Sequence, residues 1–418
     1  MKLATFSAPP TGRGAGLGSS VPPGTFWAQF GDEVLLYTDE PRWEELVERE
    51  GWSFLQPREH QVSVEREHMH VVVQNGRLFQ QEHPDVRVLL DRGRFLLVEL
   101  DPKRARRLDE ENETCYGVLP LKENQIVFDV HEPTAARTTP VAWIQDLVDK
   151  VAHPTLEADL THLVSFLTRH STSTHYAEAA TWARDQLEAM NYETRAQDIT
   201  LNGSASRNII ADKLGSSTGT RNVVLVTAHL DSINLRGGPA ASAPGADDNG
   251  SGSAGLLAMA RAFKDHRGMH DLRFVLFGGE EQGLFGSKQY VAGLSASERA
   301  KIQAVINMDM IGSLNSPAPS SVLLEGASLS QSVIDGLNEA AATYTQLTVQ
   351  TSLQSANSDH VPFIRAGLPA VLTIEGADHT NGTVHSNEDT IDRIDYDLAL
   401  EILRMNVAFI ARILSEES

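Results

Sequence analysis

The sequence predicts an α/β fold with a mostly parallel central sheet and helices on both of its faces, preceded by a small α+β domain. From residue 141 onward, apolar runs that end in turns alternate with segments of helical period. Most of these runs are apolar almost throughout, which is typical of strands buried on both faces of a parallel sheet. Before residue 133, short strand-like runs dominate instead. The two regions therefore belong to different fold classes.

The first 132 residues are expected to form a flexible segment and a small accessory domain. Residues 1–25 are rich in Gly, Pro and Ser, which predicts a flexible stretch. Residues 26–132 contain strand-like runs such as EVLLYT and RFLLVEL, with helical segments expected at 41–50 and 101–111. Asn75-Gly76, inside MHVVVQNGRLFQQ, is a hairpin signal. A propeptide, a lid and an element of oligomerisation stay open as roles for this domain.

A linker and one large domain are expected to follow. Residues 133–140 contain two prolines and predict the linker, and residues 141–418 predict the domain. The expected strands are RNIIADKL, NVVLVTAHLD, LRFVLFGGEE, KIQAVINMDMIG, SVLLEG and PAVLTIEG. The expected helices include AWIQDLVDKVA, LEADLTHLVSFLTRH, YAEAATWARDQLEAMN, GSAGLLAMARAFKD, GSKQYVAGLS and SQSVIDGLNEAAAT.

Charge and cysteine content restrict the function. The 418 residues carry a formal net charge of −21, which argues against nucleic acid or an anionic membrane as partner and favours peptides, small molecules or metal cations. The single cysteine, Cys115, excludes an intramolecular disulfide and any multi-cysteine metal site. Histidine, aspartate and glutamate must therefore hold any metal. No early apolar run predicts a signal peptide, so the chain as written is expected in the cytoplasm, although a secreted protein trimmed of its signal would look the same.

Histidines and acids follow the predicted strands. Ligands bind beyond the carboxyl ends of parallel strands, so the residues just past each apolar run indicate where a site would form. Five segments place a histidine or a carboxylate at this edge: His229 with Asp231, Asp247 with Asp248, Glu280 with Glu281, Asp309, and His385.

This set of side chains suits divalent cations. Two imidazoles and several carboxylates without a thiolate fit Zn²⁺, or a pair of ions that share one carboxylate. So many acids cannot converge without cations, because repulsion and burial would protonate some of them. In Glu280-Glu281 one carboxylate can bind metal while the other accepts a proton from water, and Asp231 can orient the ring of His229.

Each residue by itself also has a structural explanation. An aspartate before a helix is commonly an N-cap, an acidic pair in a first helical turn is favoured by the helix dipole, and a histidine in a polar loop is commonly solvated. These explanations would have to hold independently for all five segments at one edge. The functional interpretation is therefore preferred.

Six motifs, in order, resemble the zinc-dependent M28 aminopeptidases, whose clan also includes glutaminyl cyclases and certain carboxypeptidases. They are AHLD, PGADDNGSG, GGEEQGLFGS, NMDMIG, SDHVPFIRAGLPA and HSNEDT. The resemblance covers residue 155 to the C-terminus and not the accessory domain. It implies the zinc-peptidase, phosphorylase/hydrolase-like variant of the predicted fold.

The resemblance also implies roles for the site residues. His229 and Asp309 would bind one zinc, Glu281 and His385 the other, and Asp247 would bridge the two, with cobalt or manganese as substitutes. Glu280 would be the general base and later the general acid, and Asp231 the partner of His229. Asp248 would hold the loop rather than bind metal. In similar proteins the peptide bond between the two aspartates can be cis.

Other residues near the motifs are expected to have lesser roles. By the resemblance Asp359 and His360 would support the substrate pocket, and His379 lacks the sequence context of His385. Met310 and Val384 adjoin ligands and are expected in the pocket wall, with core packing as the alternative. In the accessory domain His60, His68 and His70 are expected to be surface or packing residues rather than ligands.

The resemblance thus implies a di-zinc aminopeptidase that acts on peptides with a free N-terminus. A single-zinc glutaminyl cyclase is one alternative. A carboxypeptidase or dipeptidase is another; it needs a basic group for the substrate carboxylate, and Arg365, expected to face solvent, is one of few near the motifs. A third is an inactive binding module on the same fold. The preferred N-terminal residue and the oligomeric state stay open.

Overall fold

The computed structural model describes residues 2–7, 24–38, 64–111, 116–132, 139–316 and 319–416. The chain forms two compact units. Unit 1 comprises Met1–His131 and Gln350–Asn357, and unit 2 comprises Glu132–Val349 and Ser358–Ser418. The sequence placed a boundary between residues 132 and 133 and did not predict the return of residues 350–357 to unit 1.

Unit 1 contains two groups of strands. In the first, β1 (Lys2–Ser7), β3 (Glu33–Thr38) and β2 (Thr25–Phe30) pair antiparallel, and β8 (Gln125–His131) pairs parallel with β2. In the second, β5 (Arg87–Arg92), β6 (Phe95–Glu99), β4 (Met69–Gln74) and β7 (Tyr116–Pro120) form an antiparallel sheet in that order. Helices α2 (Leu78–Glu82) and α3 (Pro102–Glu111) pack against this sheet.

Residues 2–7 form strand β1, inside the stretch 1–25 whose flexibility stays a prediction. One expectation for unit 1 was wrong. Asn75-Gly76 is not a hairpin turn, because β4 leads into α2 and pairs with β6 and β7 instead. Phe79 of α2 is fully buried with its ring edge-on to Tyr116, and this burial favours the helix over the hairpin. The helix expected at 41–50 and His60 lie outside the described residues.

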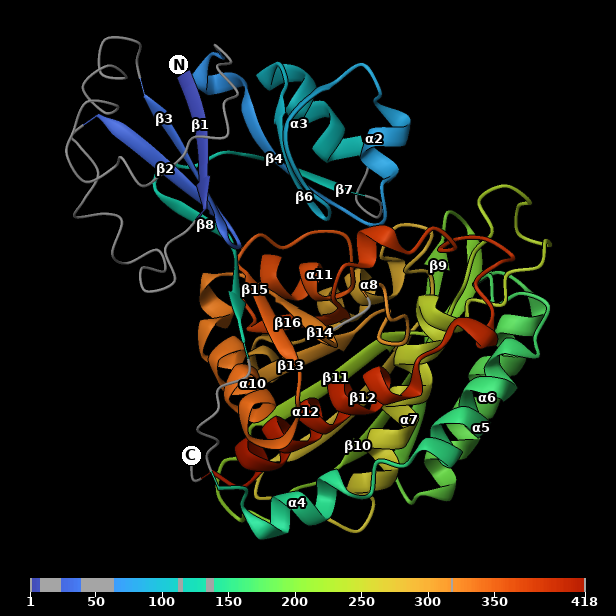
Figure 1. Cartoon of the computed structure of the whole chain (residues 1–418). Helices are drawn as coiled ribbons and strands as arrows, with labels where there is room; N and C mark the ends of the chain where they lie inside the picture. The colour runs from blue at the N-terminus through green and yellow to red at the C-terminus, as the bar shows by residue number, and fades with distance from the viewer. Residues whose placement is uncertain are drawn as a thin grey trace. The chain divides into compact units, whose positions relative to one another are not determined.

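Unit 2 is built around a mixed sheet whose four central strands are parallel. Its order is β14-β16-β13-β11-β12-β10-β9. The parallel strands are β16 (Ala370–Glu375), β13 (Ile302–Met308), β11 (Val223–His229) and β12 (Asp271–Phe277). Antiparallel strands flank them: β14 (Ser321–Glu325) on one side, β10 (Ser204–Lys213) and β9 (Glu193–Leu201) on the other. Figure 1 shows β11, β12 and β13 side by side. The predicted α/β fold is confirmed.

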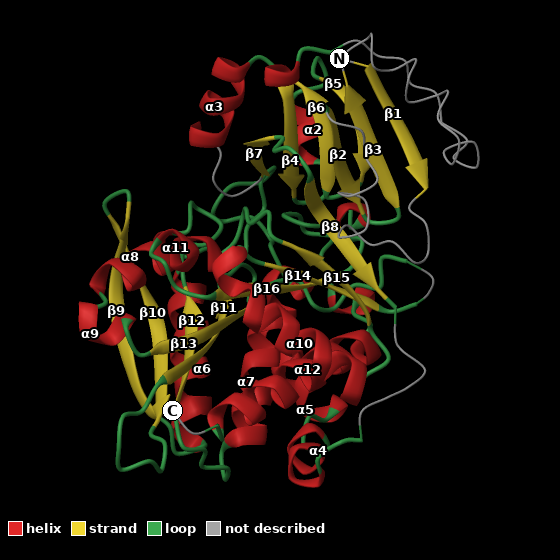
Figure 2. Ribbon diagram, turned by 90° about the vertical axis from the view of Figure 1, so that its left-hand side faces the viewer, coloured by secondary structure: helices red, strands yellow, loops and turns green. Residues whose placement is uncertain are grey.

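Helices cover both faces of this sheet (Figure 2). One face packs against α4 (Ala142–Val148), α5 (His153–Val164), α6 (Thr174–Ala189), α7 (Gly252–Phe263), α10 (Gln331–Tyr344) and α12 (Tyr396–Leu414). The other packs against α8 (Phe285–Gly293) and α11 (His360–Arg365). Two further elements are α9 (Ala296–Arg299) and β15 (Thr348–Ser352), whose residues from 350 onward belong to unit 1. Within the described residues, no helix is long and apolar enough to cross a membrane.

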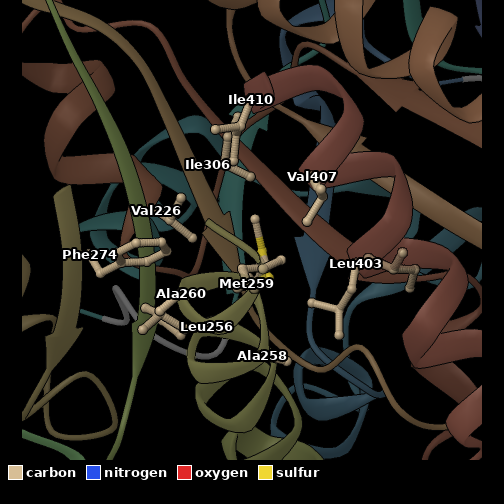
Figure 3. Packing of buried hydrophobic residues seen from close by; sticks show 14 of the residues in the cluster. Val226, Leu256, Ala258, Met259, Ala260, Phe274, Ile306, Leu403, Val407 and Ile410 are labelled. Carbon is tan, nitrogen blue, oxygen red and sulfur yellow. The ribbon is translucent and has the colours of Figure 1, made fainter. Parts of the chain in front are cut away.

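Successive residues of the central strands serve the two faces in turn. Val226 of β11 lies in the larger core, whereas its neighbour Leu225 lies in the smaller one. Figure 3 shows Val226, with Ile306 of β13, beside side chains of α7 and α12. Gly255 lets α7 approach α12 closely, since a Cβ there would lie 2.9 Å from a methyl carbon of Leu403. This packing holds α7, and therefore the loop that precedes it, against the ends of the parallel strands.

Candidate metal centre

The centre forms where the parallel strands end. His229 is the last residue of β11, and Asp309 directly follows β13. Glu280 and Glu281 follow β12 after two glycines, and Asp248 lies in the turn at Ala246–Ser251 (η3) that precedes α7. Because β11, β12 and β13 are parallel, all of these positions lie at one edge of the sheet.

His229, Asp248 and Asp309 form a first set of potential ligands. The Nε2 atom of His229 lies 3.2 Å from Oδ1 of Asp309 and 3.3 Å from Oδ1 of Asp248. All three side chains are buried. The second carboxylate oxygen of Asp309, Oδ2, accepts a hydrogen bond from the hydroxyl of Ser358 at 2.6 Å.

Asp248, Glu281 and His385 form a second set. The Nε2 atom of His385 lies 3.1 Å from Oδ2 of Asp248 and 2.9 Å from Oε2 of Glu281. In each set, the potential ligand atoms lie within 4.8 Å of one another. Asp248 therefore belongs to both sets and contributes a different carboxylate oxygen to each.

The expectation that Asp247 bridges the sets disagrees with the structure. Its Oδ1 accepts the backbone N–H of Gly312 at 2.9 Å, and its Oδ2 accepts the amide of Asn381 at 2.8 Å. Asp247 thus points away from the two imidazoles, and Asp248 occupies the shared position. The non-proline cis bond also differs from expectation, since it joins Asp248 to Asn249.

Asp389 binds the backbone of both aspartates. Its carboxylate accepts the backbone N–H of Asp247 at 2.9 Å and that of Asp248 at 3.0 Å. Sequence reasoning missed Asp389 as a functional residue, although it lies inside the motif HSNEDT. It has the same residue type as a ligand, and only its place in the fold shows that it binds backbone.

Asp231 connects His229 to the glutamate pair. Its carboxylate oxygens accept the N–H groups of Glu280 and Glu281, both at 3.3 Å. Its Oδ1 also lies 3.5 Å from Nδ1 of His229, and its backbone carbonyl lies 3.2 Å from the same nitrogen. A proton on Nδ1 can therefore be donated to Asp231, which leaves Nε2 of His229 as the ligand atom.

Burial and mutual charge shift the pKa values of these groups strongly. Burial raises the pKa of Glu281 to about 7 against the attraction of His385, and it holds the pKa of Glu280 well above its usual range. Burial acts in the same direction on Asp248, but hydrogen bonds with His229 and His385 outweigh it and lower the pKa of Asp248. The centre needs positive charge at these two imidazoles, supplied by protons or by cations.

The donors of the two sets fit divalent cations. Two imidazoles and three carboxylates converge, and Oε1 of Glu281 is buried without a hydrogen-bond partner. A neutral imidazole would turn the lone pair of Nε2 toward carboxylate oxygens, which is unfavourable unless a cation lies between them. The mixture of nitrogen and oxygen donors suits zinc, and cobalt or manganese by the same chemistry.

The remaining predicted residues lie in varied surroundings. Asp359 is fully buried, and burial raises its pKa to about 7. His360 is also buried, and its Nε2 lies 3.4 Å from Oε1 of Glu325, so it belongs to neither set. Met310 is buried, and Val384 is half-buried next to His385. Arg365 is exposed at the end of α11.

The described histidines of unit 1 belong to neither set. His70 is buried with Nδ1 3.2 Å from the carbonyl of His68. A further group of potential ligands within the described residues comprises Glu65, Glu67 and His68. Both glutamates are exposed, and exposed acidic groups are common without a bound metal.

The chain is similar to known peptidases. The model of peptidase family M28 matches residues 208–410. A leucine aminopeptidase 1 of Penicillium rubens is 30% identical over 319 residues, which cover 72% of this chain and 80% of the relative.

Among solved structures, LapB from Legionella pneumophila aligns with a TM-score of 0.61 at 18% identity, over 82% of this chain and 99% of that one. BSAP, a zinc aminopeptidase from Bacillus subtilis, aligns with a TM-score of 0.56 at 18% identity, over 63% of this chain and 96% of that one. At these identities the two structures agree with this chain in fold.

Proposed function

Because the chain belongs to peptidase family M28, we propose that it is an aminopeptidase that removes the N-terminal residue of peptides at a centre of two divalent cations. The family makes it a metallopeptidase, and its relatives support aminopeptidase activity. The observation that carries the two-cation proposal is the position of Asp248, which offers one carboxylate oxygen to each of two ligand sets.

In this proposal His229 and Asp309 hold one cation, Glu281 and His385 hold the other, and Asp248 bridges them. Zinc is the expected ion. When bound, the two ions would polarise the scissile carbonyl and lower the pKa of the attacking water. Asp231 positions His229 and the backbone of the glutamate pair, so the geometry of both sets depends on it.

Glu280 is the proposed general base. Its Oε2 lies 4.0 Å from Nε2 of His229, so its carboxylate faces the first ligand set without belonging to it. Burial raises the pKa of Glu280. A raised pKa suits a group that must take a proton from water and then give it to the leaving amine. Glu280 therefore acts first as a base and then as an acid.

The other functions of this clan are less well supported. A single-zinc glutaminyl cyclase does not need the complete second set that Glu281, His385 and Asp248 form. A carboxypeptidase or dipeptidase needs a basic side chain for the substrate carboxylate, yet Arg365 is exposed on a helix end. An inactive binding module would not need a complete set of ligand residues at both positions.

A panel of aminoacyl-4-nitroanilides tests the proposal. The full chain is assayed after chelation and again after zinc, cobalt or manganese is restored, with bound metal measured in parallel. We expect hydrolysis that chelation abolishes and metal restores, and two ions per chain. A peptide with N-terminal glutamine distinguishes hydrolysis from cyclisation by its product. Hydrolysis that survives complete metal removal would refute the proposal.

A further inference from the structure

Two buried residues, an arginine and an aspartate, hold the loop that carries Asp248. Arg169 follows α5, is completely buried, and donates from its guanidinium to backbone carbonyls. Nη2 donates to the carbonyl of Gly245 at 2.8 Å, and Nη1 donates to the carbonyl of Pro244. Arg169 therefore binds the loop just before the two aspartates.

The same guanidinium also anchors the loop to the rest of unit 2. Nε donates to the carbonyl of Leu230, just past β11, at 2.9 Å, and Nη1 reaches the carbonyl of Leu163 at the end of α5 at 3.2 Å. The backbone N–H of Arg169 donates to the hydroxyl of Ser232 at 3.1 Å. Arg169 thus ties a helix end, a strand end and the metal loop together.

Asp389 binds the next part of the loop from its amide side. Its two carboxylate oxygens accept the N–H groups of Asp247 and Asp248, and its backbone carbonyl accepts that of Ala246 at 3.2 Å. Together the two residues hold every peptide group of the loop from Pro244 to Asp248. The bonds that the charged guanidinium of Arg169 donates are stronger than bonds between neutral groups.

The loop packs so closely at Gly245 that a side chain would not fit there. Gly245 has a φ of 53°, and a Cβ there would lie 2.5 Å from the carbonyl oxygen of Asp248 and 3.0 Å from Nη2 of Arg169. Burial lowers the pKa of Arg169 to about 10 against the attraction of Asp389, so the guanidinium is still charged at neutral pH.

We propose that Arg169 and Asp389 are positioning residues for the metal centre. They fix the backbone at Pro244–Asp248 so that Asp248, and not Asp247, faces His229 and His385. The inference rests on the proposed two-cation function. Because Asp248 serves both ligand sets, disturbing either positioning residue should weaken both cation sites together. We expect each dissociation constant to rise about 10- to 100-fold, the range found for residues that orient metal ligands.

The test uses the metal-free full chain, titrated calorimetrically with Zn²⁺ alone and spectroscopically with Co²⁺ alone. The variants are Arg169→Lys, which keeps the charge but cannot make the same set of bonds, and Asp389→Asn, which keeps one acceptor oxygen. Both should bind both ions more weakly and show a changed cobalt absorption spectrum. Ser358→Ala, which among the potential ligands releases only Asp309, should weaken mainly one site.

Arg261→Lys and Asp159→Asn are matched controls. They disturb another Arg–Asp pair of unit 2, joined at 3.0 Å between α7 and α5, and should lower the melting temperature without changing the cobalt spectrum. These controls distinguish general destabilisation from misplacement of Asp248.

Wild-type zinc affinities and cobalt spectra in Arg169→Lys and Asp389→Asn would overturn the inference, as would equal losses in the two controls. If Arg169→Lys does not fold, Asp389→Asn decides the question, because it removes a single acceptor atom. Absence of zinc binding in the wild-type chain would instead refute the proposed function, and this inference with it. The wild-type titration therefore distinguishes the two failures.

Discussion

Replacing Asp248 by asparagine should reduce the number of bound cations from two to one. Oδ1 and Oδ2 of Asp248 face different imidazoles, at 3.3 Å from His229 and 3.1 Å from His385. An asparagine keeps one oxygen and presents an NH₂ group to the other imidazole. An NH₂ group is a hydrogen-bond donor and cannot act as a metal ligand. One set therefore loses its shared ligand, and the other keeps it.

Loss of the negative charge of Asp248 should also weaken binding of the remaining cation. At an effective dielectric constant of 20, Coulomb's law gives an attraction of roughly 5 kcal/mol between a carboxylate and a unit positive charge about 3 Å away, before the cost of burial. Even a third of this value corresponds to more than a tenfold change in an equilibrium. The remaining cation should therefore bind at least tenfold more weakly.

Asp247→Asn is the matched comparison. Its oxygen can still accept the N–H of Gly312, but the amide of Asn381 loses its acceptor at a cost of about 1–3 kcal/mol. This variant should therefore be less stable and still bind two cations. Calorimetric titration of both metal-free variants with zinc, together with thermal melting, measures the difference.

The reverse pattern would contradict the assignment of the two aspartates. If Asp248→Asn binds two cations with wild-type affinity while Asp247→Asn binds one, Asp247 is the bridging ligand. If both variants bind two, neither aspartate bridges the ligand sets.

Three further predictions follow from the same contacts. Glu280→Gln should lower kcat by about 10²- to 10⁴-fold while the chain still binds two cations, measured on an aminoacyl-4-nitroanilide; an unchanged rate would exclude Glu280 as the base. In the metal-free chain, burial raises the pKa of Glu281 to about 7 and of Asp389 to about 8. The folded state therefore binds more protons than the unfolded state, and its melting temperature should fall as the pH rises from 6 to 8; a rise would contradict these shifts. Leu403→Ala should cost about 2–5 kcal/mol in urea unfolding, whereas Leu329→Ala, at 42% exposure, should change the stability by about 0.5 kcal/mol or less.

The sequence predicted the parallel strands well because burial on both faces leaves a clear pattern. β11 and β13 are apolar almost throughout, and both were expected where they occur. β9 was not predicted, since most of its residues are exposed or half-buried and its composition is polar. The return of residues 350–357 to unit 1 depends on contacts far apart in the chain, such as the bond from the Asn357 amide to the carbonyl of Val73. Local patterns cannot show such contacts.

At the site, the sequence predicted residue types better than their orientation. Most expected ligands converge, because strand ends determine where their backbones lie. Asp247 and Asp248 are neighbours of equal chemistry, and contacts far away in the sequence, such as the backbone bonds that Asp389 accepts and the N–H that Gly312 donates to Asp247, distinguish their two carboxylates. Arg169 had no sequence signal, since a single arginine after a helix is commonly exposed. Its role depends on complete burial.

Unit 1 contains a segment from the C-terminal part of the chain, and this has a consequence for proteolytic processing. Residues 350–357 lie far downstream of the linker and yet form part of unit 1, where Ser352 donates to the carbonyl of Val127 at 2.7 Å. A protease that cut between residues 132 and 139 would leave this segment seated in the N-terminal fragment while still covalently joined to the C-terminal one. The nicked protein would show two bands on a denaturing gel and one peak in gel filtration. Cleavage alone would not release unit 1, so a propeptide role would require this segment to detach as well.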